Sequence, residues 1–351
     1  MSSVKRFDLL DGWRGLCAFV VVALHYCEAY RHPEFLPHSH LAVEYFFMLT
    51  GFTFIVAYDE RWRTGGLTLM KFLWRRFVRL WPPILVGSFV GLLFAFVVGS
   101  RFYGGLHDPG TALASFAWSL TMYPQSKGFM TPMQPQTWTL LYIVYANLIY
   151  AFILRHFRTW MLAVAVVAAA GYSIWVESCH HNFAFGWDFS SKHIVVACAR
   201  MVFPVLTGML LARLRWKIAF PGAGIIATAL LVLALWTPLF PKVGVAFGRF
   251  ELVTVFCVLP FVLLCGAGAR IPEGWFSRLC GFLGKYSFPL YATHFPLRNV
   301  LGNWVADHPD ASAAENAAVV FAFVVAALAL AYLCMQAIDA LVRLLSSRQK
   351  F

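Results

Sequence analysis

Long apolar stretches alternate with short polar segments along the whole chain. A helix that crosses the hydrocarbon core of a bilayer needs about 20 mainly apolar residues, and ten stretches approach that length. They are 11–30, 42–58, 72–98, 138–154, 160–176, 194–214, 219–239, 252–268, 283–304 and 317–345. A further apolar stretch, 112–122, is too short to span. The pattern predicts an all-α integral membrane protein, a bundle of about ten transmembrane helices that forms a single domain over residues 1–351.

The composition agrees with a membrane protein. Hydrophobic residues make up 60% of the chain and charged residues 13%, whereas a soluble domain carries about 25% charged residues. The net charge is +12, but the 28 lysines and arginines lie in short clusters rather than in one basic run, which argues against nucleic acid as a partner. Most clusters fall in alternate connecting segments, which by the positive-inside rule predicts that both termini are cytoplasmic.

The first apolar stretch contains four ionisable residues, Asp11, Arg14, His25 and Glu28. An ionisable side chain inside a span is costly and points to function. Arg14 and His25 are eleven residues apart, close to three helical turns, so they share one helix face about 16 Å apart along the axis. Asp11 and Glu28 lie one turn beyond them, which predicts a polar stripe along a channel inside the bundle. The alternative is that Asp11 and Arg14 are interfacial anchors and His25 is a buried structural histidine.

Two further polar features belong to the same region. Glu44 opens the second stretch at about the depth of His25, where it would either hydrogen-bond the imidazole or lie at the interface as a carboxylate. Arg75, Arg76 and Arg79 lie at the predicted cytoplasmic end of the third stretch. Guanidinium groups suit bidentate binding of phosphate, but a basic turn beside a span equally suits anchoring to lipid headgroups.

Arg200 and His294 lie within later apolar stretches, where they are costly without partners, so both are candidates for a substrate site. Histidines in the predicted outer loops lack the fixed spacing of a metal site, so no metal is expected. These are His32, His38, His40, His180 and His181. The eight cysteines form no CxxC pair and mostly lie in apolar stretches, as buried hydrophobic residues do.

Five motifs, taken in order, resemble those of the acyltransferase-3 family, whose bacterial membrane proteins acylate surface polysaccharides, lipids and some secondary metabolites. The first motif is RFDLLDGWRGLCAFVVVALHY, in which Arg14 and His25 match an arginine and a histidine separated by ten residues. The others are EYFFMLTGF with Glu44, RRFVRLWP, ARMVFPVLTGMLLARL, and GKYSFPLYATHFPL with Ser287, Tyr291 and His294. The ordered set covers most of the chain and is far more specific than any one motif.

The resemblance implies a ten-helix membrane domain that takes an acyl group from acyl-CoA, with acetyl-CoA the expected form of this co-substrate. It implies an acceptor hydroxyl on a cell-envelope glycan or lipid-linked sugar, a place in the bacterial inner membrane, and no permanently bound cofactor. It also implies catalysis by the histidine of the first helix, His25.

The spacing of the polar residues fits this chemistry. CoA is a polyanion, so its phosphates are expected at the cytoplasmic end, on Arg14, Arg75, Arg76 and Arg79. His25, with Glu28 or Glu44 as its carboxylate partner, would act as a general base or carry the acyl group transiently. The substrate pocket is expected to contain Trp138, Tyr142, Arg200, Ser287 and His294.

One position departs from the family pattern. Members commonly carry a glutamate in the fourth helix, whereas this chain has Ile143 at the corresponding place, five residues after Trp138. Either Glu28 or Glu44 takes over the role of that carboxylate, or the chain is a catalytically inactive member that binds a glycan or a partner. A transporter or flippase is a further alternative, because charges within spans also mark translocation paths. That function predicts inverted repeats, which the sequence does not show.

Overall fold

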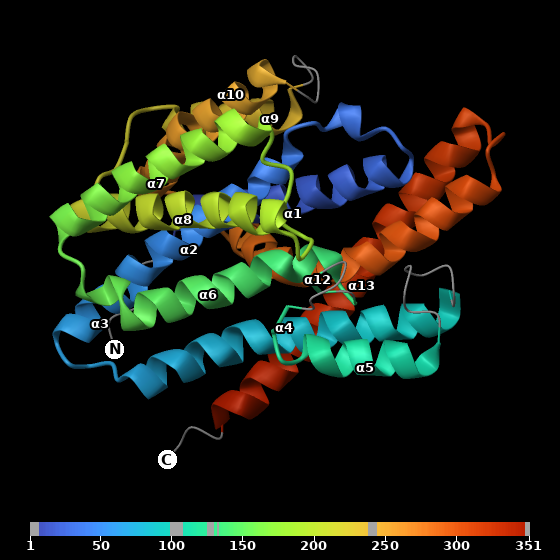
Figure 1. Ribbon diagram of the computed structural model, residues 1–351, viewed down its shortest axis with the longest axis horizontal. Helices are drawn as coiled ribbons and strands as arrows, with labels where there is room; N and C mark the ends of the chain where they lie inside the picture. The colour runs from blue at the N-terminus through green and yellow to red at the C-terminus, as the bar shows by residue number, and fades with distance from the viewer. Residues whose placement is uncertain (1–6, 99–107, 125–129, 132, 238–243, 348–351) are drawn as a thin grey trace.

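The computed structural model describes residues 7–98, 108–124, 130–131, 133–237 and 244–347, and in these ranges it contains helices and no β-strand. The helices form an elongated bundle (Figure 1). Their bounds are α1 Asp8–Ala29, α2 Ala42–Phe54, α3 Glu60–Arg63, α4 Leu69–Val98, α5 Pro109–Ser119, α6 Trp138–Phe152, α7 Thr159–His180, α8 Ser191–Leu214, α9 Ala223–Trp236, α10 Val245–Val253, α11 Leu259–Gly268, α12 Trp275–Asp307 and α13 Ala313–Ser347. Single π-helical turns, Ile55–Asp59 and Thr254–Val258, join α2 to α3 and α10 to α11.

Each of the ten predicted stretches overlaps a helix, which confirms the predicted all-α class. Within the described ranges, seven helices are long and apolar enough to cross a membrane. They are Asp8–Ala29, Ser39–Arg63, Leu69–Val97, Thr159–His180, Ser191–Leu214, Val245–Gly268 and Ala313–Ser346. The other three stretches fall in α6 and α9, which have 15 and 14 residues, and in the more polar α12. The protein is therefore a multi-pass membrane protein, while the predicted count of about ten spans is not confirmed.

The short apolar stretch 112–122 forms most of α5. Asp108 caps this helix, since its carboxylate accepts a hydrogen bond from the backbone N–H of Thr111 at 2.9 Å. α5 lies along the end of α4 (Figure 1) and has 11 residues, too few to span. It is a surface helix against the bundle, in agreement with the prediction that this stretch is too short to span.

α1 packs along α12 through glycines. A Cβ on Gly15 of α1 would lie 2.6 Å from the Cβ of Leu283, and one on Gly284 of α12 would lie 2.7 Å from the Cβ of Asp11. Small residues let two helices approach closely in a membrane, where no hydrophobic effect drives them together. The close approach places the polar face of α1 against the polar face of α12.

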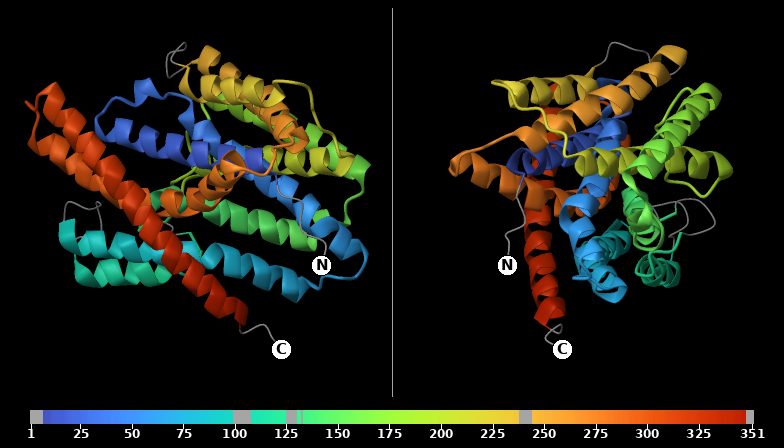
Figure 2. Two further views of the ribbon diagram at one scale, coloured as in Figure 1. Left: turned by 180° about the vertical axis from the view of Figure 1, so that it is seen from behind. Right: turned by 90° about the vertical axis from the view of Figure 1, so that its left-hand side faces the viewer.

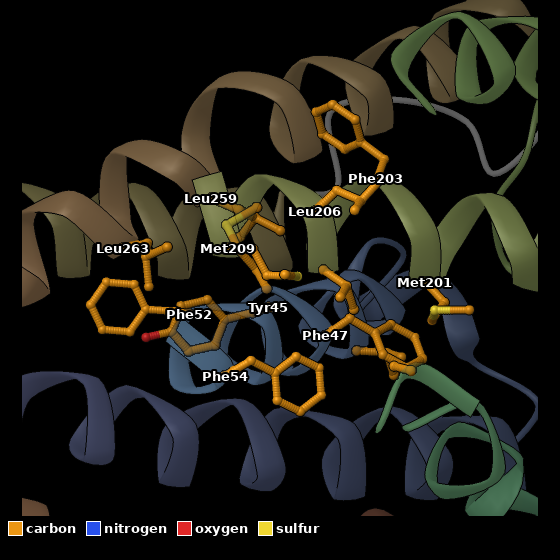
Figure 3. Packing of buried hydrophobic residues seen from close by; sticks show 14 of the residues in the cluster. Tyr45, Phe47, Phe52, Phe54, Met201, Phe203, Leu206, Met209, Leu259 and Leu263 are labelled. Carbon is orange, nitrogen blue, oxygen red and sulfur yellow. The ribbon is translucent and has the colours of Figure 1, made fainter. Parts of the chain in front are cut away.

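A second close crossing, between α2 and α8, lies at the centre of the apolar core. A Cβ on Gly51 would overlap the carbonyl oxygen of Val205, and one on Gly208 would overlap that of Met48. Figure 3 shows the apolar side chains that fill the space around this crossing. Those from α2, α8 and α11 are Tyr45, Phe47, Phe52, Phe54, Met201, Phe203, Leu206, Met209, Leu259 and Leu263.

The beginning of α1 and the end of α13 lie toward the same end of the long axis (Figures 1 and 2). α12 and α13 run side by side over much of their length, and both also contact α4. The structure contains no bilayer, so the prediction that both termini lie on one side of it is not confirmed. Their cytoplasmic location likewise stays a prediction.

Candidate functional site

A cavity of about 660 Å³ opens between α1, α8, α12 and the segments that precede α2 and α6. We call it the histidine cavity, because His25 of α1 lines it. Its walls combine aromatic rings and polar side chains, which include Trp138, Trp187, Phe247, Phe295, Gln136, Asn182, Asn299 and Asn303. A mainly apolar pocket with a few polar groups and a volume of about 300–1,000 Å³ is typical of a small-molecule site.

His25 is held on three sides within this cavity. Its Nδ1 lies 2.9 Å from the carboxylate of Glu28, one turn later in α1. Its ring stacks on that of His294 with centroids 5.2 Å apart and meets the edge of Phe295 at 5.1 Å. With Nδ1–H donated to the carboxylate, Nε2 carries the lone pair, so the Glu28 contact selects the tautomer that can act as a base.

Glu44 does not bind His25, although the sequence offered it as a carboxylate partner. It is 1% exposed and is hydrogen-bonded to the guanidinium of Arg200, through Nε and through Nη2 at 3.2 Å. Arg200 also donates to the carbonyls of Phe185 at 2.8 Å and His40 at 2.9 Å, and it lies 5.0 Å from the centroid of the Trp138 ring. Arg200 lines the histidine cavity, and its hydrogen bonds tie three segments of the chain together.

Replacing Arg200 by methionine should destabilise the protein strongly. The Arg200→Met variant leaves the Glu44 carboxylate buried without its charge partner, and breaking a buried ion pair in this way costs about 3–5 kcal/mol. The measurement is thermal unfolding of the detergent-solubilised chain, with the double variant Arg200→Met/Glu44→Leu as the comparison. The double variant should recover most of the loss. Equal instability of both variants would show that the ion pair is not the source of the effect.

A second cavity, of about 260 Å³, lies between α1, α2, α4, α6 and α12. We call it the arginine cavity, because Arg14, Arg76 and Arg79 line it together with Lys285. Arg14 is anchored to α12, since it donates to the carbonyl of Gly284 at 2.6 Å, and it forms an ion pair with Asp11 at 3.0 Å. Four cationic side chains around so small a space give it a positive potential, which favours an anion.

Arg75 was predicted to act with these arginines, but it lines a separate cavity of about 370 Å³ between α4, α12 and α13. That cavity shares Arg79 and Lys285 with the arginine cavity. The two are therefore neighbours, and the three predicted arginines of α4 lie around one basic region.

The histidine and arginine cavities adjoin at Val43 and Tyr291, which line both. The Tyr291 hydroxyl donates to the carbonyl of Gln136 at 2.8 Å and lies 2.9 Å from the Thr139 hydroxyl, so the ring is fixed in place. The sequence predicted one continuous polar channel along α1. The structure instead has two cavities with these side chains in the wall between them.

The remaining predicted pocket residues are divided among different places. Trp138 lines the histidine cavity, whereas Ser287 lines the arginine cavity and accepts a hydrogen bond from Nε of Arg14 at 3.2 Å. Tyr142 lines neither cavity and packs edge-on against Trp138, with centroids 5.7 Å apart. His294 is fully buried behind His25, with Nδ1 2.9 Å from the carbonyl of Tyr291.

One buried carboxylate near the histidine cavity was not predicted. Glu251 of α10 is fully buried, accepts a hydrogen bond from the backbone N–H of Phe183 at 2.8 Å, and lies 2.6 Å from Nε2 of His40 and 3.8 Å from Nδ1 of His38. Its charge directly before the apolar stretch 252–268 was the available signal. Among the described residues no group of three or more His, Cys, Asp or Glu side chains has the arrangement to hold a metal ion.

Comparison with known proteins gives two matches. A sequence model of the acyltransferase-3 family, described as an acyltransferase domain, matches residues 7–336, a range that includes every residue of both cavities. A curated protein of Rhizobium radiobacter, "Protein 2 in picA locus", is 31% identical over 165 residues, which cover 43% of this chain and 83% of that protein. No solved structure matches the chain.

Proposed function

Because this chain belongs to the acyltransferase-3 family, we propose that it moves an acyl group, acetyl in the first instance, from acyl-CoA to a hydroxyl of a cell-envelope glycan or lipid-linked sugar. The proposed location is the bacterial inner membrane, with the arginine cavity on the cytoplasmic side. One observation carries the proposal: a cavity with cationic walls adjoins a cavity that contains a carboxylate-bound histidine. Donor and acceptor would then reach the reaction from different cavities.

The donor side follows from charge and size. The phosphates of CoA would bind around Arg79 and Arg76. Arg79 lines the arginine cavity and also the neighbouring cavity that contains Arg75, whereas Arg76 is 6% exposed and lies 5.6 Å from the Phe54 ring. The arginine cavity is too small for the whole of CoA, and its apolar walls suit the narrow pantetheine arm. The thioester would lie at the far end of this arm, beside Tyr291.

The chemical step is assigned to His25 in one of two forms. As a general base, Nε2 removes the proton of the acceptor hydroxyl while the oxygen attacks the thioester carbonyl, and the CoA thiolate leaves. As an acyl carrier, Nε2 attacks the carbonyl itself, the thiolate leaves, and the acceptor oxygen then takes the acyl group from the imidazole with loss of its proton. In both forms the Glu28 carboxylate stabilises the positive charge that the ring acquires.

A catalytically inactive member of the family is the second candidate, and Ile143 is the observation that favours it. This residue lines the arginine cavity, so the usual carboxylate of the fourth helix is replaced there by an apolar side chain. Incubation of the purified chain with labelled acetyl-CoA separates the two candidates. Hydrolysis or transfer of the label supports the enzyme, whereas binding without turnover supports the inactive member.

The donor assignment predicts the kinetics of two variants. Arg76→Ala and Arg79→Ala should each raise the KM for acetyl-CoA by about ten-fold or more, with a smaller effect on kcat, because each removes charge-assisted hydrogen bonds to phosphate. Initial rates at varied acetyl-CoA provide the measurement, with Arg63→Ala, an exposed arginine outside both cavities, as the control. An unchanged KM in both variants would contradict donor binding at this site.

The overall function is tested in cells. Mass analysis of cell-envelope glycans, from a strain that expresses the chain and from one in which the gene is deleted, should show a loss of acyl groups on deletion. Complementation with the intact gene should restore them. Identical acylation in the two strains would refute a glycan acceptor.

A further inference from the structure

We propose that the acceptor carries an anionic group, a carboxylate or a phosphate, and that Arg298 binds it in the histidine cavity. This inference rests on the proposed acyltransferase function and adds the chemical class of the acceptor. It follows from three observations. They are the balance of charges around the cavity, the missing hydrogen-bond partners of the Arg298 guanidinium, and the position of Arg298 relative to His25.

The charges that line the histidine cavity do not balance. Three arginines line it, Arg31, Arg200 and Arg298, against a single carboxylate, that of Glu28. Arg200 is neutralised by Glu44, and Glu28 faces the imidazole of His25. Arg31 and Arg298 therefore leave a net positive potential at the cavity, and a cavity of one sign of charge with low-dielectric walls attracts an anion.

Arg298 lacks the partners that a half-buried guanidinium normally has. Within the described residues its nearest hydrogen-bond partner is the side-chain oxygen of Asn299, 3.4 Å from Nη1, and Nε has no partner. The flat group lies 5.6 Å from the centroid of the Phe295 ring, which orients it. The neighbouring Asn299 is 6% exposed, and its buried Nδ2 has no partner either.

Buried donors of this kind are costly unless something accepts from them. A carboxylate or phosphate supplies several acceptor oxygens, and a guanidinium binds either group through two parallel N–H···O bonds. The donor atoms of Arg298 and Asn299 thus match an anionic group better than a neutral sugar hydroxyl.

The position of Arg298 would make such binding productive. Tyr291, His294 and Arg298 follow one face of α12 at spacings of three and four residues, so Arg298 lies about 6 Å along the axis from the residue that stacks on His25. An anionic group held there fixes one end of a sugar. The next hydroxyls of that sugar then fall near the imidazole, with Trp138 and Phe247 available to pack on the ring.

Transfer assays with one glycan in three chemical forms test the inference. Membranes that contain the full chain are incubated with labelled acetyl-CoA and the cell-envelope glycan of the source strain, freed of its own acyl esters. The same glycan is then used after reduction of its carboxyl groups to alcohols, and after removal of its phosphate groups. Transfer should fall at least about ten-fold after the treatment that removes the recognised anion, which distinguishes a carboxylate from a phosphate.

Equal transfer to all three forms would overturn the inference while leaving the acyltransferase function intact. No transfer to the untreated glycan, combined with no loss of acyl groups on gene deletion, would instead refute the proposed function on which the inference rests.

A pair of variants locates the recognised anion. Arg298→Gln should raise the KM for the untreated glycan about ten- to a hundred-fold, leave the KM for acetyl-CoA unchanged, and show no further loss with the glycan whose anion has been removed. Arg249→Gln, which changes an exposed arginine outside the cavity, is the matched control. Loss of transfer to the same degree with charged and uncharged glycan would mean that Arg298 has only a structural role, and would overturn the assignment.

Discussion

Replacing His25 by alanine should lower acyl transfer by about 100- to 10,000-fold, the range that a positioned general base contributes. The imidazole lines the histidine cavity, its Nδ1 is bound to Glu28, and its Nε2 is available to an acceptor hydroxyl. Transfer of label from acetyl-CoA to glycan is the measurement. The protein should still insert and purify normally, because the ring is 19% exposed at a cavity wall rather than packed in the apolar core.

His32→Ala provides a matched control for this variant. His32 also lies next to a carboxylate, with Nδ1 2.7 Å from Glu34, but it is exposed and lines neither cavity. It should retain full activity. Full transfer by the His25→Ala variant would reject the catalytic role, and equal loss in both variants would indicate a general effect of removing histidines from this region.

The two forms of catalysis by His25 differ before the acceptor binds. An acyl carrier accumulates label on the protein when labelled acetyl-CoA is added without glycan, and hydroxylamine removes that label. A general base leaves the protein unlabelled. Rapid quenching of the wild-type chain and of the His25→Ala variant therefore separates the two forms.

The second large effect concerns stability, at the crossing of α2 and α8. Gly51→Ala should destabilise the protein by about 3 kcal/mol or more, because the new methyl group overlaps the carbonyl oxygen of Val205 and the two helices must move apart. Thermal or denaturant unfolding in detergent is the measurement. Gly208→Ala, on the facing helix, should have an effect of similar size because its Cβ overlaps the carbonyl of Met48.

Gly171→Ala is the control, and we expect it to change the stability of the protein in the opposite direction. Gly171 lies within α7, and a Cβ there meets nothing within 4 Å. Alanine favours a helix over glycine by about 0.5–1 kcal/mol, so this variant should be as stable as the wild type or more so. If Gly51→Ala is also neutral, the close approach of α2 and α8 is wrong.

The sequence was sufficient to predict the helices and the polar face of α1. Both depend on local periodicity, which a single chain displays directly. Arg14 and His25 lie on that face as expected, one at each cavity. The arginines of α4 were also placed correctly as a basic cluster, although Arg75 faces a neighbouring cavity because its side chain leaves the helix in a different direction from Arg76.

The pairing of charges between distant helices could not be predicted in the same way. Glu44 and Arg200 are 156 residues apart, and depth in the membrane suggested His25 as the partner of Glu44 instead. Equal depth is necessary for contact but does not determine the direction around the helix axis, which depends on how α2 packs against α8. Arg298 was not predicted as a site residue, because the shortage of partners around its guanidinium is a property of the folded chain.

The boundary between the two cavities has a consequence for the energy balance of the cell. In the proposed location, the bacterial inner membrane, the bilayer holds a proton gradient, and a charged, water-filled passage through a protein would dissipate it. In the proposed arrangement Val43 and Tyr291, which line both cavities, would separate them at this point, and the Tyr291 hydroxyl is hydrogen-bonded to the backbone carbonyl of Gln136. The thioester and the hydroxyl must come into contact for transfer, so the protein would have to join the two cavities locally during the reaction without opening a continuous path for ions across the bilayer.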